Sequence, residues 1–159
     1  MTERFRKHVR LNGYDYSSNG YYFITICASG RHGNCRQYSG IIEKELKILE
    51  RHNGVKIDYF TLMPEHLHFI VVLQDMRIPL SRLMQEFKSR TTIEIRKNGY
   101  RGKHFWQPNY YEHIIRNDTA LTKIREYIQN NPTVETLDWR KIYDKEKVGE
   151  ASFAATKNR

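Results

Sequence analysis

The residues best suited to chemistry are two histidines, His66 and His68, which one leucine separates in the run HLHFIVVL. β-Branched and aromatic residues dominate this run and predict a β-strand over 66–73. Because side chains alternate along a strand, both imidazoles lie on one face and four apolar residues lie on the other. Two imidazoles at this spacing can bind one metal ion, although two polar residues on a half-exposed strand show the same pattern.

A tyrosine and an asparagine further along the chain could complete such a site. Tyr127 and Asn131 are four residues apart, so on a helix one lies above the other. Asn117-Asp118 supplies the N-cap of this helix, and Pro132 ends it. The amide oxygen of Asn131 suits a hard divalent ion such as Mg²⁺ or Mn²⁺. A core tyrosine and a helix C-cap are the alternative roles of these two residues.

The charge of the chain favours a nucleic-acid partner. Lys and Arg number 27 against 18 Asp and Glu, the formal net charge is +9 at pH 7, and 13% of the residues are aromatic. Cations pair with phosphates and aromatic rings stack on unpaired bases, but a basic protein without such a partner has the same composition. The possible metal site, the tyrosine and the positive charge of the chain together indicate phosphodiester chemistry. In such a reaction the metal polarises the phosphate and the phenol attacks it.

Three groups of cations are candidates for contact with DNA. A basic N-terminal arm could hold the phosphates of a hairpin stem, a second group lies on the second predicted helix, and one arginine precedes the tyrosine helix. A solvated tail and a solvated helix face are the alternatives. The candidate DNA-binding residues are Arg4, Arg6, Lys7 and Arg10 in the arm, Lys88 and Arg90 on the helix, and Arg116 before the tyrosine helix.

The order of the elements predicts how these residues come together. Periodicity, turn residues and helix caps predict the order β-α-β-β-α-β-α. The first six elements form an α+β, ferredoxin-like (RRM-like) βαββαβ arrangement, in which one antiparallel sheet carries both helices on one face. The other face is left for substrate or for the additional C-terminal helix, which would bring Tyr127 to the histidines. The predicted strands are 21–29, 55–62, 66–73 and 110–116, and the predicted helices are 41–52, 80–97 and 118–130.

The chain is predicted to be one domain over 1–159, with a basic arm at 1–12 and a polar, partly flexible tail at 140–159. Two cysteines, Cys27 and Cys35, cannot build a disulfide framework. No run approaches the roughly 20 apolar residues of a membrane span. The basic N-terminus lacks the apolar run of a signal peptide. These features predict a cytoplasmic protein with no membrane partner.

Several separated motifs resemble one known family. The segment MPEHLH at 63–68 resembles the MPxHxH motif of the single-tyrosine HUH transposases, whose signature is two histidines around a hydrophobic residue. The segment YIQNNP at 127–132 resembles the YIxxNP motif of the REP-associated tyrosine transposases, a branch of that family. The resemblance runs in order from about residue 10 to residue 139. The further matching segments are Tyr14-Asp15-Tyr16, Phe87-Lys88-Ser89, Trp106-Gln107 and YYEHIIR at 110–116.

This resemblance implies a role for each residue of the constellation. It implies that His66 and His68 bind Mg²⁺ or Mn²⁺, that Asn131 is the third protein ligand and that Tyr127 is the nucleophile. Insertion-sequence members commonly have glutamine where this chain has Asn131, which favours the REP-associated branch. Glu65 replaces the asparagine that is common before the first histidine, and it puts a carboxylate near the metal.

The implied activity is that of a metal-dependent single-strand DNA endonuclease and strand transferase. Members of the family join a 5′-phosphotyrosine to single-stranded DNA, leave a free 3′-OH and recognise short imperfect hairpins. They act as monomers or as homodimers, so the resemblance leaves both states open for this chain. It also leaves open whether the tyrosine serves its own chain or a partner, and whether the element still moves.

Two other functions fit the same residues. A non-catalytic ferredoxin-like module could bind RNA through aromatic residues of its open sheet face, such as Tyr21 and Phe23. A metal-dependent hydrolase could use an activated water, with Tyr127 purely structural. Tyr110 and Tyr111 are rival nucleophiles, but adjacent strand residues point to opposite faces, which predicts a core position for at least one of them.

Overall fold

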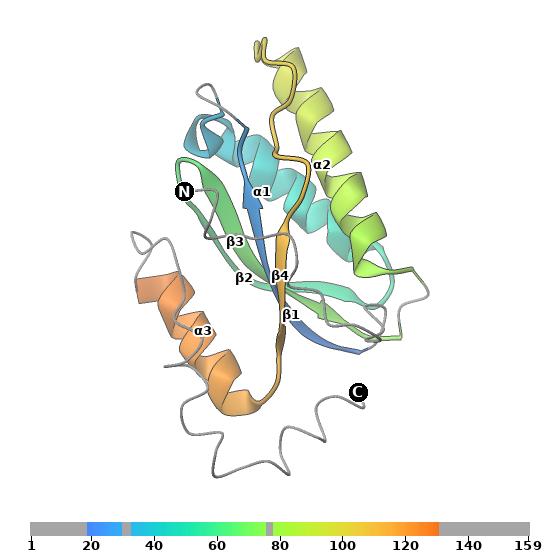
Figure 1. Ribbon diagram of the computed structural model, residues 1–159. Coiled ribbons are helices and arrows are strands. Elements are labelled where there is room, and N and C mark those ends of the chain that lie inside the picture. The colour runs from blue at the N-terminus through green and yellow to red at the C-terminus, as the bar shows by residue number, and fades with distance from the viewer. Residues whose placement is uncertain (1–18, 30–32, 76–77, 131–159) are drawn as a thin grey trace.

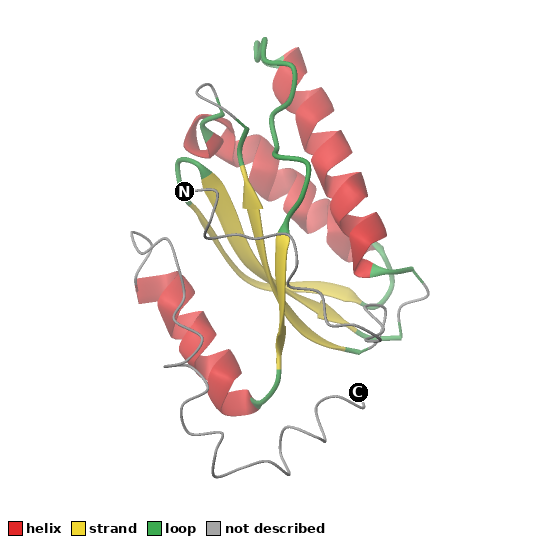
Figure 2. Ribbon diagram, in the orientation of Figure 1, coloured by secondary structure: helices red, strands yellow, loops and turns green. Residues whose placement is uncertain are grey.

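The computed structural model describes residues 19–29, 33–75 and 78–130. Within them the chain forms a four-stranded sheet flanked by helices (Figures 1 and 2), and the predicted order of elements is confirmed. The predicted basic arm and polar tail lie outside the described residues. The strands are β1 (Gly20–Cys27), β2 (Val55–Leu62), β3 (His66–Leu73) and β4 (Tyr111–Ile115); the α-helices are α1 (Ser39–Ile48), α2 (Leu80–Lys97) and α3 (Asp118–Asn130); the 3-10 helices are η2 (Cys35–Tyr38) and η3 (Leu49–Arg51).

The sheet has the strand order β2-β3-β1-β4, and each neighbouring pair is antiparallel. β1 and β3 are therefore the central neighbours, as the ferredoxin-like arrangement requires. Helices α1 and α2 cover one face of the sheet and α3 covers the other (Figure 1). The predicted α+β fold, with an additional C-terminal helix, is confirmed. Over the described residues, none of the helices combines the length and the apolar character needed to cross a membrane.

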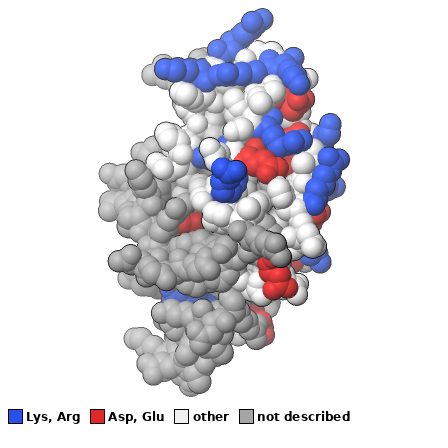
Figure 3. Space-filling view, turned by 90° about the vertical axis from the view of Figure 1, so that its right-hand side faces the viewer, with Lys and Arg blue, Asp and Glu red and all other residues white. Residues whose placement is uncertain are grey.

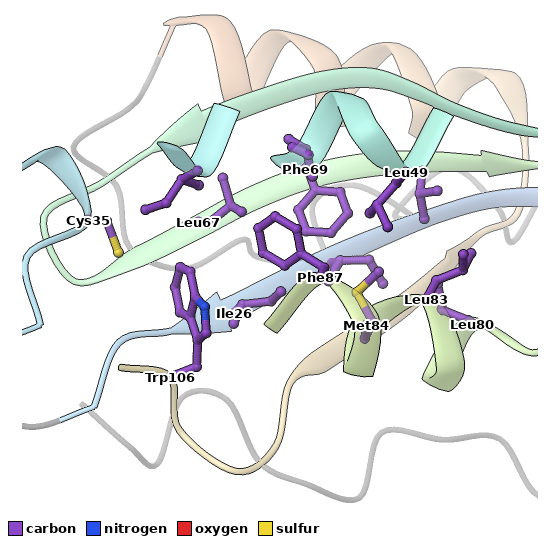
Figure 4. Close-up of a cluster of buried hydrophobic side chains, with 14 of the residues drawn as sticks. Ile26, Cys35, Leu49, Leu67, Phe69, Leu80, Leu83, Met84, Phe87 and Trp106 are labelled. Carbon is purple, nitrogen blue, oxygen red and sulfur yellow. The ribbon is translucent and has the colours of Figure 1, made fainter. Parts of the chain in front are cut away.

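The main hydrophobic core lies between the sheet and helices α1 and α2 (Figure 4). Alternate side chains of β1 and β3 point into it, and Phe69 of β3 meets Phe87 of α2 with their ring centroids 6.3 Å apart. Trp106 closes one end of this core, where its indole N–H donates to the Thr91 hydroxyl (2.7 Å). Only 5% of Trp106 is exposed, so this ring packs in the core and is not available to stack on a base.

A second, smaller core lies between the opposite face of the sheet and α3. Its helix side is an apolar stripe at helical spacing, and its sheet side comes from β1, β3 and β4. The Asn117 Oδ1 accepts a hydrogen bond from the Ala120 backbone N–H (2.7 Å), which confirms the predicted N-cap of α3. The buried residues of this second core are Phe23, Ile70, Tyr111, Ile115, Ala120, Leu121, Ile124 and Ile128.

The boundaries of three elements differ from the predictions by one to four residues. β1 ends at Cys27, and the next residue, Ala28, forms an isolated antiparallel bridge with Trp106. The first helix begins earlier than predicted, at Ser39, and its last turn tightens into η3. β4 begins one residue later than predicted, at Tyr111.

We expect Phe69→Ala to lower the free energy of unfolding by about 3–5 kcal/mol, because it removes a ring from the centre of the main core. Urea unfolding followed by circular dichroism measures this change. The control is Ile93→Ala on α2, whose side chain is 54% exposed and whose loss should change the stability by less than about 0.5 kcal/mol. Equal losses in the two variants would contradict the core position of Phe69.

Candidate functional site

His66 and His68 lie next to each other on β3, on the face of the sheet that α3 covers. Only 3% and 2% of these residues are exposed, and their ring centroids are 5.1 Å apart. Leu67 between them points into the main core, so the alternation predicted from the sequence accounts for the shared face of the imidazoles. Two imidazoles held this close can donate to the same metal ion.

The ring of His68 is held by two residues of the neighbouring strand β1. Its Nδ1 lies 2.8 Å from the hydroxyl oxygen of Thr25, the residue directly opposite on β1. On one side the ring stacks on Phe23, with the centroids 5.6 Å apart and the planes 19° from parallel. The contact with Thr25 occupies Nδ1 and so assigns Nε2 of His68 as the nitrogen that can coordinate a metal.

Burial also sets the protonation state of this site. Desolvation, with a smaller contribution from His66, lowers the pKa of His68 from 6.5 to about 3. The His68 ring is therefore neutral at physiological pH. A neutral imidazole retains the lone pair that metal coordination requires, so this environment suits a metal ligand.

Tyr127 projects from the last part of α3 toward the same site. Its ring meets the ring of His68 edge to face, with the centroids 6.3 Å apart and the planes at 70°. The second core sets this position, since Ile124 and Ile128 on either side of Tyr127 are buried against the sheet. The tyrosine itself is half-buried at the margin of this apolar stripe. The structure thus brings Tyr127 to the histidines of its own chain.

The third predicted ligand, Asn131, lies outside the described residues. Within residues 19–29, 33–75 and 78–130, no group of three or more His, Cys, Asp or Glu side chains could hold a metal ion. A metal centre built on His66 and His68 therefore needs a further donor of another chemical type or from another segment. An amide oxygen from the residue after α3 meets both conditions.

The predicted DNA-binding residues fall into three places. The cations of the N-terminal arm, Arg4, Arg6, Lys7 and Arg10, lie outside the described residues. Lys88 and Arg90 lie on α2, which covers the sheet face opposite the histidines. Arg116 lies between β4 and α3 and is half-buried. Figure 3 shows that Lys and Arg side chains gather at the end of the molecule where α2 ends.

The two candidate DNA-binding cations on α2, Lys88 and Arg90, make contacts within the protein. The Lys88 amine donates to the carbonyl oxygens of Gln107 (2.7 Å) and Asn109 (2.9 Å), which holds the segment before β4 against α2. Burial lowers the pKa of Lys88 from 10.5 to about 8. Arg90 forms an ion pair with the buried carboxylate of Glu45 on α1 (2.7 Å). Both residues thus have a structural role whether or not they also contact DNA.

The rival tyrosines lie on opposite faces, as their adjacency predicts. Tyr110 packs against the main core. Tyr111 lies on the histidine face, directly across from Thr25 of β1, but only 8% of it is exposed beneath α3. The half-buried Tyr127 is thus more open to a substrate than Tyr111 is.

Sequence reasoning missed three residues that support this site. Thr25 contacts His68 from the next strand, and the pair Asp58 and Arg125 joins β2 to α3 through two hydrogen bonds of 2.7 and 2.9 Å. The sequence around Thr25 predicts a strand, but which residue faces Thr25 depends on the register between β1 and β3. The contact between Asp58 and Arg125 spans 67 positions in the chain and has no local signal.

Comparison with known proteins identifies relatives. A family model described as "Transposase IS200 like" matches residues 16–131. A protein of Haemophilus influenzae without an assigned function is 33% identical, over 84% of this chain and 91% of its own length. The REP-associated tyrosine transposase of Escherichia coli is 28% identical, over 74% of this chain and 68% of its own. A solved structure of a REP-associated tyrosine transposase bound to a REP hairpin has a similar fold, with a TM-score of 0.65 and 24% identity, over 78% of this chain and 73% of that one.

We expect Thr25→Val to lower the free energy of unfolding by about 1–3 kcal/mol, because it removes the hydroxyl that faces Nδ1 of the buried His68 ring. Denaturant unfolding measures the loss, and the imidazole resonances of His68 in NMR spectra report the altered ring environment. Thr25→Ser keeps the hydroxyl and should retain the wild-type His68 resonances. Identical His68 resonances in the valine variant would contradict the contact.

Proposed function

The chain belongs to the family of IS200-like transposases, and from this premise we propose that it nicks and rejoins single-stranded DNA with Tyr127 as nucleophile. The observation that supports this most directly is the contact between the Tyr127 and His68 rings on the covered face of the sheet. It puts a phenol beside two imidazoles suited to metal binding, which are the parts that phosphodiester transfer needs. The reaction would take place in the cytoplasm.

The proposed reaction transfers one phosphodiester bond to the protein and back. The Tyr127 oxygen loses its proton and attacks the phosphorus, and the bond from phosphorus to the 3′ oxygen breaks. The DNA 5′ end is then held as a phosphotyrosine, while the departing oxygen takes up a proton and becomes a free 3′-OH. The phosphotyrosine retains the energy of the broken bond, so a 3′-OH can later attack it and restore the strand.

The residues present fit a divalent metal. His66 and His68 would supply two neutral imidazole nitrogens, and Asn131 would supply an amide oxygen, a mixed donor set that suits Mn²⁺ and is compatible with Mg²⁺. When bound, the ion supplies positive charge that polarises the scissile phosphate and favours the ionised form of the phenol. Thr25 fixes the His68 ring for this purpose, because it engages the nitrogen that does not coordinate.

The proposed substrate is single-stranded DNA beside a hairpin. A relative of similar fold was solved in complex with a REP hairpin, and this chain carries a net charge of +9. Arg116 lies two residues before α3, at the end of that helix opposite to Tyr127, where it would contact a phosphate away from the nick. The arm residues Arg4, Arg6, Lys7 and Arg10 would contact the stem, and Lys88 and Arg90 would add positive charge around α2.

The position of α3 argues against RNA binding on an open sheet face. That function needs exposed rings on the face of the sheet, but Phe23 is 1% exposed and belongs to the second core beneath α3. Tyr21 is also packed against this core. The two aromatic residues therefore have a structural role that base stacking would disrupt.

We expect the wild-type protein, incubated with Mg²⁺ and a labelled single-stranded hairpin from the flanks of its own gene, to form a DNA-linked protein band on a denaturing gel. Tyr127→Phe should reduce this band below detection, because the variant lacks the attacking oxygen, and should bind the hairpin with unchanged affinity. Tyr111→Phe removes a neighbouring hydroxyl on the same face and should retain the band.

The other outcomes separate the competing functions. Cleavage without a covalent band, unchanged in Tyr127→Phe, would identify a hydrolase that uses water. A covalent band that Tyr127→Phe retains and Tyr111→Phe lacks would assign the nucleophile to Tyr111. Hairpin binding without cleavage, in Mg²⁺ and in Mn²⁺ alike, would contradict the proposed catalysis.

We expect chelation with EDTA to abolish the covalent band while the hairpin remains bound, and we expect added Mn²⁺ to restore it. His66→Ala and His68→Ala should each weaken Mn²⁺ binding by at least about tenfold, measured by electron paramagnetic resonance, since each removes a nitrogen ligand. His104→Ala, an exposed histidine in the segment before β4, is the matched control. Equal Mn²⁺ affinity in all three variants would locate the metal elsewhere.

A further inference from the structure

We propose that Asp58 and Arg125 act as a latch that positions Tyr127 against the histidines of its own chain. This inference rests on the proposed function for its consequence in catalysis, but the latch itself is a feature of the protein without DNA. Arg125 lies two residues before Tyr127 on α3, and Asp58 lies on β2, an outer strand of the sheet. Neither residue is in the metal or nucleophile set, so both are positioning residues.

The pair has the geometry of a two-point contact. The Arg125 Nε donates to one carboxylate oxygen of Asp58 at 2.7 Å, and its Nη2 donates to the other oxygen at 2.9 Å. The guanidinium also lies over the ring of Tyr59, 5.5 Å from the centroid. A guanidinium bound to both carboxylate oxygens fixes the orientation of the two side chains as well as the distance between them, which a single hydrogen bond does not.

A β-bulge in β2 makes this contact available. Ile57 is paired with Val71 of β3 and Tyr59 is paired with Ile70, so the register shifts at Asp58. In a regular strand Ile57 and Tyr59 would share a face. Here Ile57 packs against the main core and Tyr59 against the second core. The extra residue of the bulge therefore turns both Asp58 and Tyr59 toward α3.

The apolar contacts of α3 set the position of Tyr127 over the sheet, and the ion pair adds a directional constraint to them. Ile124 and Ile128 hold the helix against the sheet through burial, which is non-directional and tolerates a small roll of the helix about its axis. Tyr127 stands at the margin of the buried stripe, where such a roll moves its ring away from His68 most. The two-point contact of Arg125 opposes this rotation of α3, because it connects one side of the helix to β2.

The exposure of the pair favours positioning over bulk stability. The side chains are 33% exposed for Arg125 and 14% for Asp58. Solvent that reaches Arg125 screens this ion pair, so its contribution to the free energy of unfolding stays modest even with the two-point geometry. Loss of the pair should therefore loosen α3 without unfolding the sheet.

The first test follows α3 directly, without DNA or metal. Hydrogen exchange measured by mass spectrometry should show α3 amides exchanging about tenfold faster than in wild type in Asp58→Asn and in Arg125→Gln. The double variant should exchange no faster than either single variant. The β1 and β3 amides should keep their protection in all three. The matched control is Glu45→Gln, which breaks the ion pair with Arg90 on the other side of the sheet and should leave α3 unchanged. Unchanged α3 exchange in Asp58→Asn, or faster exchange throughout the sheet, would overturn the latch.

The second test measures the consequence for catalysis. At saturating hairpin and Mg²⁺, single-turnover formation of the covalent band should slow by about tenfold in Asp58→Asn, with hairpin affinity unchanged. The rate in Arg125→Lys should lie between this variant and wild type, because lysine keeps the positive charge but cannot make the two-point contact. A wild-type rate in Asp58→Asn would overturn the positioning role. If wild type itself forms no covalent band, the proposed function fails, and the exchange measurement still decides the latch.

Discussion

The candidate site depends on one constraint, the two-residue period of β3 between two covered faces. Leu67 and Phe69 point into the main core, and the same alternation sends His66 and His68 to the opposite face. A slip of one residue in the register would turn the imidazoles into the main core and the apolar side chains toward α3. The core that stabilises the fold and the face that carries the chemistry are thus two sides of one strand.

Helix α3 covers the second face of the sheet, and in doing so it encloses the polar side of β3 as a candidate functional site. Without the helix, the imidazoles would meet water and titrate near their usual pKa of about 6.5. Beneath α3, burial lowers the pKa of His68 to about 3 and makes its contact with Thr25 an energetic necessity. The same helix brings Tyr127, so the packing of α3 on the sheet both keeps the His68 imidazole neutral and places a phenol beside it.

The sequence predicts features that lie within one helix or strand, and it misses contacts that depend on how two elements are placed relative to each other. The strand β3, the helix α2 and the N-cap at Asn117 were foreseen because their signals are local: an alternating run, an apolar stripe and a capping amide. Thr25 could not be assigned to His68, since the facing residue depends on the register between two strands. Asp58 was hidden for a similar reason, because a bulge changes which side chains share a face without changing the composition of the strand.

The position of Tyr127 in the last part of α3 also bears on the role proposed for a metal ion at this site. The C-terminal end of a helix carries partial negative charge, which repels a phosphate that approaches the tyrosine. Glu65, the exposed residue before His66, adds a carboxylate at the start of β3. The neutral His68 ring brings no charge to offset this, whereas Lys123 and Arg125 of α3 place positive charge within about one helical turn of Tyr127. In the proposed reaction, a divalent ion held by His66 and His68 would add positive charge beside the phenol and favour the approach of a DNA phosphate.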